Sequence, residues 1–205
     1  IAISTKKAES YVFDTMDAGA AYLLNLLKDS SLTMVGHNIK FDYLFLYNCL
    51  YNKINVKICD TLTMYILLDE NSQDNGLKYL SSILTDIPKN YAKGVDTKKL
   101  VDLPRNELFL YNGRDADATL RLYYVLYSEL EKQGKLPLLE FLNDVLLTIA
   151  HIEINGIYVD KDWAKEKGKE IKAEYKTIED SYAVIYPDLN LNSPIKLSRI
   201  LYQDL

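Results

Sequence analysis

The chain has 205 residues, 48% of them hydrophobic, with only 8 glycines and 5 prolines, a composition that excludes a disordered or low-complexity protein. Its formal net charge of −5 argues against a protein that coats duplex nucleic acid, because such binding depends on lysine and arginine displacing counterions. An active site built from carboxylates remains compatible with this charge.

The first elements expected along the chain belong to a mixed sheet. Short apolar runs flank a charged turn, which predicts a β-hairpin formed by residues 1–4 and 11–14. Alanine and leucine content predicts a helix over residues 18–28. A short apolar run then predicts a strand over residues 32–35 that ends at Gly36.

Further strands and helices alternate after this point. Asn38 can cap the next helix, and residues 56–59 are the next expected strand, with Asp60 placed to cap the helix that follows. After the Asn75-Gly76 turn, residues 77–84 are expected to be helical. This alternation favours an α/β fold in which helices pack on a mixed sheet.

The pattern changes in the second half of the chain. Prolines, a glycine and mixed charge predict a loop over residues 85–104, and a long helix is expected from there to about residue 133, ended by Gly134. Beyond Gly134 the chain is predicted to be mainly helical, with capped helix starts at Asp160 and Ser193. We therefore place a domain boundary near Gly134.

Two short segments place a carboxylate four residues after a polar residue, within apolar stretches of helical character. They are Gly36-His37-Asn38-Ile39-Lys40-Phe41-Asp42 and Tyr111-Asn112-Gly113-Arg114-Asp115. On a helix this spacing brings both groups to one face. Two carboxylates with a phenol beside them are suited to holding divalent metal ions over a phosphodiester and to orienting an attacking water, which is nuclease chemistry.

These segments resemble the second and third motifs of the DEDD exonucleases of the tyrosine subgroup. With the connecting stretch from Asp60-Thr61 to residues 75–80, they look like the 3′-5′ proofreading domain of family A, DNA polymerase I-like, enzymes. Residues 153–160 resemble the passage from exonuclease to polymerase, and residues 190–197 resemble a polymerase signature at the base of the thumb. The last two segments separate this family from the RNase D group.

The resemblance implies an RNase H-like mixed sheet flanked by helices and truncated at its N-terminus, followed by a mainly helical segment. It implies an exonuclease domain over residues 1–134 that lacks its first motif. Residues 135–205 would be the start of a polymerase domain, with the linker helix and the base of the thumb. The implied function is removal of nucleotides from DNA 3′ ends by two-metal hydrolysis, within a replication and repair enzyme.

The motifs also imply site residues. By resemblance, Asp42 and Asp115 would be ligands of Mg²⁺ or Mn²⁺, and Tyr111 would hydrogen-bond the attacking water. Asn38 and Phe41 stand at motif positions that bind substrate. Asn38 can equally be only a helix cap, and for Phe41 a place in the hydrophobic core is the favoured alternative.

Other charged residues receive structural interpretations. Asp117 lies about 200° around the helix from Asp115, so it cannot share the face of Tyr111 and Asp115; a solvated or structural role is expected, such as an ion pair with Arg121. Four lysines fall on one face of a later helix, where interleaved glutamates favour a solvated surface over phosphate binding. They are Lys165, Lys169, Lys172 and Lys176.

One part of the family pattern is missing. The pattern requires an Asp-x-Glu pair on the first strand, and none occurs before Asp42. Two aspartates are too few to offset the repulsion between two cations, so we expect the isolated chain to bind metal weakly and to cleave little. Two alternatives stay open: a nuclease-inactive scaffold domain of a polymerase, and a 3′-5′ exoribonuclease similar to RNase D.

Partners and location follow from the same resemblance. We expect a monomer that binds the 3′ end of single-stranded DNA and, through the longer enzyme, primer-template DNA. No apolar run is long enough to span a bilayer and no segment resembles a signal peptide, so the cytoplasm or nucleoid of a bacterial or phage-infected cell is expected. Cys49 and Cys59 are expected to be buried, reduced thiols, and the start at Ile1 suggests a piece of a longer protein.

Overall fold

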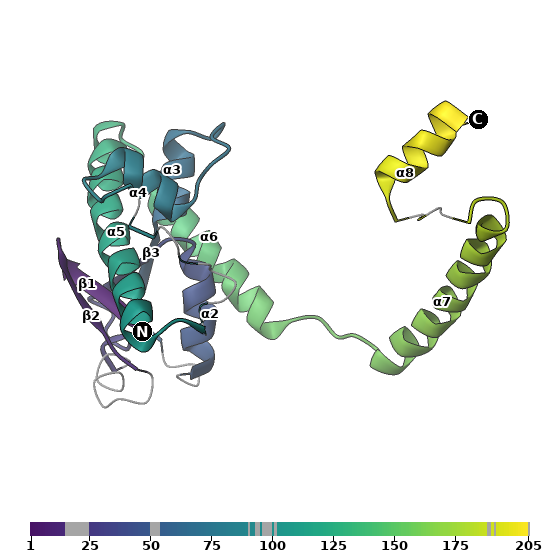
Figure 1. The fold of residues 1–205 in the computed structure, drawn as a ribbon. Coiled ribbons are helices and arrows are strands. Elements are labelled where there is room, and N and C mark those ends of the chain that lie inside the picture. Colours follow the sequence, from purple (N-terminus) through teal and green to yellow (C-terminus); the bar gives the residue numbers. More distant parts are fainter. Residues whose placement is uncertain are drawn as a thin grey trace. The chain divides into compact units, whose positions relative to one another are not determined.

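The computed structural model describes residues 1–14, 25–49, 54–89, 91–92, 95, 100, 102–187, 190 and 192–204. The chain divides into two compact units, Ile1–Asn155 and Gly156–Leu205, and each is described by itself. The described strands and both candidate motifs belong to the first unit (Figure 1).

The described strands form two pairs. β1 (Ala2–Lys6) and β2 (Glu9–Val12) make the antiparallel hairpin that the sequence predicted. β3 (Thr33–Gly36) and β4 (Lys57–Asp60) pair in parallel, and the last residue of each lies opposite the other. The mixed α/β class is thus confirmed, although the described strands form two separate two-stranded sheets where one sheet was expected.

Helices make up most of the described residues in each unit. Those of the first unit are α2 (Ile39–Cys49), α3 (Thr61–Leu68), α4 (Leu77–Leu84), α5 (Arg105–Lys132) and α6 (Leu136–Asn155). The second unit contains α7 (Lys161–Ala183), α8 (Pro194–Arg199) and the π-helical turn η2 (Ile200–Asp204). The helix expected over residues 18–28 lies mostly outside the described residues.

The predicted helix boundaries agree with the structure in several places. The side chains of Asp60, Asp160 and Ser193 accept hydrogen bonds from the first turns of α3, α7 and α8. Gly134, with a φ of 67°, follows α5 as predicted, since a residue without Cβ adopts this left-handed conformation at little cost.

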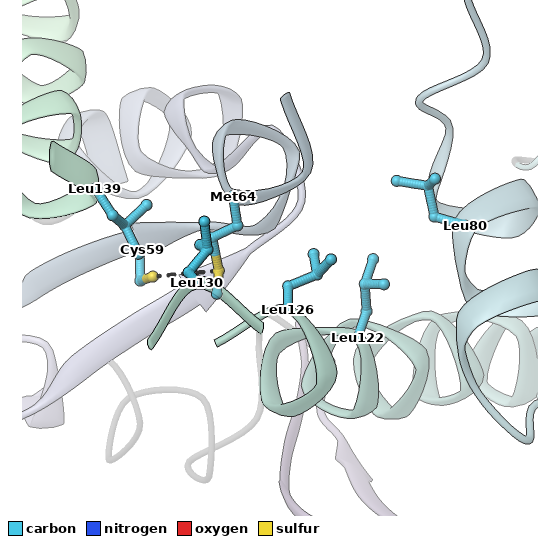
Figure 2. Close-up of a cluster of buried hydrophobic side chains, with 7 residues drawn as sticks. All are labelled: Cys59, Met64, Leu80, Leu122, Leu126, Leu130 and Leu139. Atoms are coloured by element: carbon cyan, nitrogen blue, oxygen red, sulfur yellow. Dashed lines mark hydrogen bonds between the residues drawn. The ribbon is translucent and has the colours of Figure 1, made fainter. Parts of the chain in front are cut away.

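One hydrophobic core joins α5 to β4, α3, α4 and α6. Its buried members are Cys59, Met64, Leu80, Leu122, Leu126, Leu130 and Leu139 (Figure 2). The three leucines of α5 recur every fourth residue and therefore lie along one face of the helix. This contact fixes α5, which carries the third motif, against the rest of the unit.

A second cluster holds α2, which carries the second motif. Ile39 and Tyr43 are buried one turn apart and face β4 and α6. Phe41 lies about 200° around the helix from Ile39 and is 71% exposed. The expectation that Phe41 is a core residue is therefore wrong. Cys49, at the end of α2, is also exposed, whereas Cys59 is the buried free thiol that was expected.

The first unit extends beyond the boundary expected near Gly134. α6 contributes Leu139 to the first cluster and Ala150 to the second. Lys40 of α2 also forms an ion pair with Glu153 of α6. α6 is therefore part of the compact unit that carries the motifs, while the assignment of residues 135–205 to a polymerase domain stays a prediction.

In the second unit, α7 is rich in charged residues. No residue of α7 is buried, and Lys167 pairs with Glu170 one turn away. The four lysines that share a face of this helix are all exposed, in keeping with a solvated surface. Among the described helices, none has both the length and the apolar character needed to cross a bilayer.

Candidate active site

The second motif is shaped by a buried carboxylate from another element. Asp60, at the end of β4, is only 2% exposed. Its Oδ1 accepts hydrogen bonds from the N–H groups of Asn38 at 2.7 Å, Ile39 at 3.3 Å and Leu62 at 3.2 Å, and its Oδ2 accepts from the Thr63 hydroxyl at 3.1 Å. The predicted cap of α3 therefore also fixes the start of α2.

Asn38 contributes its backbone to this turn. It has a φ of 60°, its N–H is bound by Asp60, and its carbonyl accepts from the N–H of Phe41 at 3.1 Å. The side chains of Asn38 and Phe41 are both exposed. Both motif positions assigned to substrate by resemblance are thus accessible from solvent.

Asp42 lies in the first turn of α2 and is exposed. Even so, the surrounding protein raises the pKa of its carboxyl group by desolvation, and the nearby charge of Asp60 raises the pKa further. A bound cation would offset this effect, because it stabilises the charged form of Asp42.

The third motif places Tyr111 and Asp115 one turn apart on α5. Tyr111 is buried, and Nζ of Lys78 lies 4.8 Å from the centroid of its ring. Burial is the main cause that raises the pKa of Tyr111, Asp115 raises it further, and Lys78 acts in the opposite direction. The phenol therefore keeps its proton at neutral pH.

Tyr91 is a site residue that the sequence did not single out. Its hydroxyl donates to Oδ1 of Asp115 at 2.7 Å, and its backbone carbonyl accepts from the guanidinium of Arg114 at 3.2 Å. Burial first, and the Asp115 carboxylate second, raise the pKa of Tyr91. Nothing in the loop sequence distinguished this tyrosine from the other 16, because its partner belongs to a distant helix.

Gly113 explains how the motif helix approaches the hairpin. A Cβ atom at this position would lie 2.6 Å from Oγ of Ser10 and 3.2 Å from Cγ2 of Val12. A side chain at this position would require Ser10 and Val12 to move, so Gly113 allows α5 to lie this close to β2.

Asp117 has a structural role, as the helical geometry predicted. It is buried, and Arg121 binds both of its carboxylate oxygens, at 3.1 Å through Nε and 2.6 Å through Nη2. The same carboxylate accepts from the N–H of Ala8 at 2.8 Å, at a hairpin turn where φ is 63°. The expected ion pair is confirmed, and it also fastens the β1–β2 turn to α5.

The structure brings Tyr111 and Asp115 together and places Asp42 on a different helix. Within the described ranges, no hydrogen bond or ion pair joins Asp42 to either residue. The two motifs are instead connected through the start of α4. Nε2 of His37 lies 2.9 Å from the carbonyl oxygen of Asn75, just before the N-cap of α4, and Lys78 of α4 lies over the Tyr111 ring.

The candidate ligands Asp42 and Asp115 have the chemistry that a divalent cation prefers, but two carboxylates are too few for a complete site. Carboxylate oxygens are the ligands that Mg²⁺ and Mn²⁺ prefer in proteins. Among the side chains that the structure describes, no group of three or more His, Cys, Asp or Glu residues is placed to hold a metal ion. Asp42 and Asp115 alone would therefore form an incomplete site.

Comparison with known families identifies residues 1–131 with a family described as 3′-5′ exonuclease. DNA polymerase I of Borreliella burgdorferi is 32% identical over an alignment that covers 100% of this chain and 24% of that protein. DNA polymerase I of Treponema pallidum is 30% identical, with 89% of this chain and 19% of that protein covered. The chain thus spans about a quarter or less of these relatives.

The fold of this chain is also similar to solved structures of another protein, NrnC. NrnC of Brucella melitensis superimposes with a TM-score of 0.56 and 25% identity, over 65% of this chain and 64% of that protein. The same protein bound to pGG gives a TM-score of 0.56 over 68% of this chain and 69% of its own.

Proposed function

The chain belongs to the 3′-5′ exonuclease family found in DNA polymerase I-like proteins, and from this premise we propose that its parent protein removes nucleotides from DNA 3′ ends. The observation that carries the proposal is the pairing of Tyr111 with Asp115 on one face of a helix fixed to the core. The second motif is joined to the same region through α4.

Asp42 and Asp115 are the proposed ligands of Mg²⁺ or Mn²⁺. Such ions, when bound, stabilise negative charge on a phosphodiester and make water a better nucleophile. The part of this chain is to present oxygens at fixed positions. Asp115 is held by Tyr91, and Asp42 is carried on a helix whose first turn is held by Asp60.

Tyr111 is proposed to orient the attacking water. Because burial and Asp115 raise its pKa, the phenol is a poor base, and it acts by accepting or donating a hydrogen bond. Its burial limits the positions that its hydroxyl can take, which favours a single orientation for the water.

Asn38 and Phe41 are proposed to contact the nucleotide. Both are exposed on the turn and helix that carry Asp42. An exposed aromatic ring can stack on a base whatever its identity, and a carboxamide can donate to a phosphate or sugar oxygen. These roles suit an enzyme that degrades single strands without sequence preference.

Further carboxylates are needed to complete the site. Among the described strands, β1 pairs only with β2 and β3 only with β4, and both β1 and β3 pack against α5. A strand of the parent protein that bears Asp-x-Glu, paired with the remaining edge of β1 or β3, is proposed to supply them. The isolated chain is then expected to bind metal weakly and to have little activity.

The wider context is proposed from the relatives. They are bacterial DNA polymerases I together with phage enzymes such as the DNA polymerase of Escherichia phage T5, 28% identical over 81% of this chain. We assign residues 135–205 to the start of the polymerase part. We further propose that the protein acts as a monomer on single-stranded 3′ ends and primer-template DNA in the cytoplasm or nucleoid.

The test uses a longer protein that includes residues preceding Ile1, with the 205-residue chain in parallel. Each is incubated with 5′-labelled single-stranded DNA and Mg²⁺ or Mn²⁺. The longer protein should shorten the DNA one nucleotide at a time from its 3′ end. Asp42→Asn and Asp115→Asn should each lower the rate by about 100-fold or more, since metal ligation is worth several kcal/mol.

Asp144→Asn, an exposed aspartate on α6, is the matched control and should leave the rate unchanged. Absence of cleavage by the longer protein would favour the scaffold alternative. Preference for short RNA over DNA would favour the RNase D-like alternative. Robust turnover by the 205-residue chain alone would contradict the proposal that its site is incomplete.

A further inference from the structure

His37, within the second motif, forms contacts with two other parts of the first unit. It follows β3 directly, its imidazole is half-buried, and both ring nitrogens have partners. Nδ1 lies 2.9 Å from Oγ1 of Thr61, and Nε2 lies 2.9 Å from the backbone oxygen of Asn75. One side chain thus links the second motif to the starts of α3 and α4.

The partners of His37 determine which tautomer is present. A carbonyl oxygen only accepts, so Nε2 must carry a hydrogen and donate to Asn75. The Thr61 hydroxyl has one hydrogen and two acceptors within reach, which are Nδ1 of His37 and the carbonyl oxygen of Gly36 at 3.1 Å. In the neutral imidazole Nε2 therefore donates to Asn75, while Nδ1 and the Gly36 carbonyl oxygen compete for the single hydroxyl hydrogen of Thr61.

The start of α4 lacks a side-chain cap, so the hydrogen bond from His37 to the Asn75 carbonyl matters more for its position than it would for a capped helix. Gly76 is its N-cap residue and supplies no side-chain hydrogen bond. The side-chain oxygen of Asn75 is buried and has no hydrogen-bond partner among the described residues, an unfavourable arrangement. The backbone carbonyl of Asn75 is the acceptor that His37 holds.

The first turn of α4 also contacts the third motif. Lys78 is half-buried, with its ammonium group over the ring of Tyr111. A displacement of the first turn of α4 would move this cation relative to the ring. The contacts therefore form a continuous path from His37 through Asn75 and Lys78 to Tyr111.

We propose that His37 is a positioning residue that fixes the first turn of α4, and through Lys78 the Tyr111 ring, relative to the second motif. Its importance for cleavage rests on the proposed nuclease function, whereas the linkage itself concerns only the contacts described above. His37 is not proposed to touch substrate or metal.

The test measures the linkage by NMR in the 205-residue chain, without substrate or metal. The N–H of Leu80 donates to the carbonyl of Gly76 at 2.9 Å, so its hydrogen exchange reports opening of the first turn of α4. Ring signals of Tyr111 are identified by their loss in Tyr111→Phe. Exchange at Leu126, buried in α5, serves as the reference for global unfolding.

His37→Phe keeps an aromatic ring and removes both hydrogen bonds. We expect it to accelerate exchange at Leu80 by at least tenfold more than exchange at Leu126, and to shift the Tyr111 ring signals. His37→Gln, whose carboxamide N–H can donate to Asn75, should return both readouts toward wild type. His151→Phe removes a bond from α6 to Tyr43 of α2 and keeps an aromatic ring, but affects no partner of His37, so it should change neither.

A second measurement varies the pH. In the wild-type chain, titration of His37 should shift the Leu80 amide and Tyr111 ring signals together with its own, and His37→Gln should remove that titration. Unchanged Leu80 exchange and Tyr111 signals in His37→Phe would overturn the proposal, as would Tyr111 signals that do not follow His37. Because no readout involves cleavage, failure of the nuclease proposal would be seen separately.

Discussion

At the scale of single residues, His37 couples its protonation to folding. Desolvation lowers the pKa of His37 below its ordinary value, although the Asn75 carbonyl and the Asp60 charge act in the opposite direction. An unfolded histidine titrates near pH 6.5, so the unfolded chain binds this proton at a higher pH than the folded chain does. The contribution of neutral His37 to stability is therefore present above about pH 6.5 and is lost as pH falls through the folded pKa.

This linkage predicts that the stability of the wild-type chain depends on pH more strongly than the stability of His37→Gln does. The free energy of unfolding should fall more steeply between pH 7 and pH 5 in the wild-type chain than in His37→Gln, which cannot take up the proton. Urea unfolding at a series of pH values measures this slope. His151→Gln, which replaces the other histidine, is measured beside His37→Gln as the control for the loss of an imidazole. Equal slopes in wild type and His37→Gln would contradict the prediction.

Residues whose partners are close in sequence were predictable, and those with distant partners were not. The Asp117–Arg121 pair follows from a separation of four residues on one helix. The capping role of Asp60 follows from its place before an apolar helix. The second role of Asp60, at Asn38, depends on the parallel register of β3 and β4, and the Tyr91–Asp115 bond spans 24 residues from a loop. No local pattern encodes either contact.

At the scale of elements, the packing of α5 on the hairpin depends on Gly113. Gly113→Leu should destabilise the first unit by about 1–3 kcal/mol, because a side chain would push α5 away from Ser10 and Val12. Denaturant unfolding followed by circular dichroism measures this loss. The same shift should weaken the bond from Asp117 to the hairpin turn.

Gly168→Leu is the matched control for this substitution. Gly168 lies within α7, and a Cβ atom added there meets nothing within 4 Å. Leucine has a higher helix propensity than glycine, so this change should preserve or increase helicity in α7. Equal destabilisation by the two substitutions would show that the close approach of α5 to β2 is not what requires Gly113.

The sequence predicted where helices and strands occur better than it predicted which face of each helix is buried. The helix from Leu77 to Leu84 and the end of α5 before Gly134 follow from turn and stop residues. The face that α2 buries was not evident, since apolar residues occur all around it, including Phe41 and Phe45, both exposed. Only the position of β4 and α6 selects Ile39 and Tyr43 as the buried side.

At the scale of the whole molecule, the limit of the compact unit is set by α6. The sequence placed a boundary near Gly134 because the pattern becomes mainly helical there, and the family match ends at residue 131. The compact unit nevertheless continues to Asn155. Asn143 of α6 is buried, and its side-chain oxygen accepts from the N–H of Asp60 at 3.3 Å. A helix beyond the matched residues thus supports the carboxylate that shapes the second motif.

Two truncated chains distinguish these boundaries. A chain that ends at Asn155 should unfold cooperatively with the stability of the first unit intact, because no buried side chain of either cluster is removed. A chain that ends at Gly134 loses Leu139 and Ala150 and should be less stable by at least about 2–5 kcal/mol, the usual cost of one large cavity in a core. Urea unfolding of both chains measures the difference. Equal stability would place the physical boundary at Gly134 and would mean that α6 only rests on the unit, whereas the expected loss would make α6 a structural part of the candidate nuclease site.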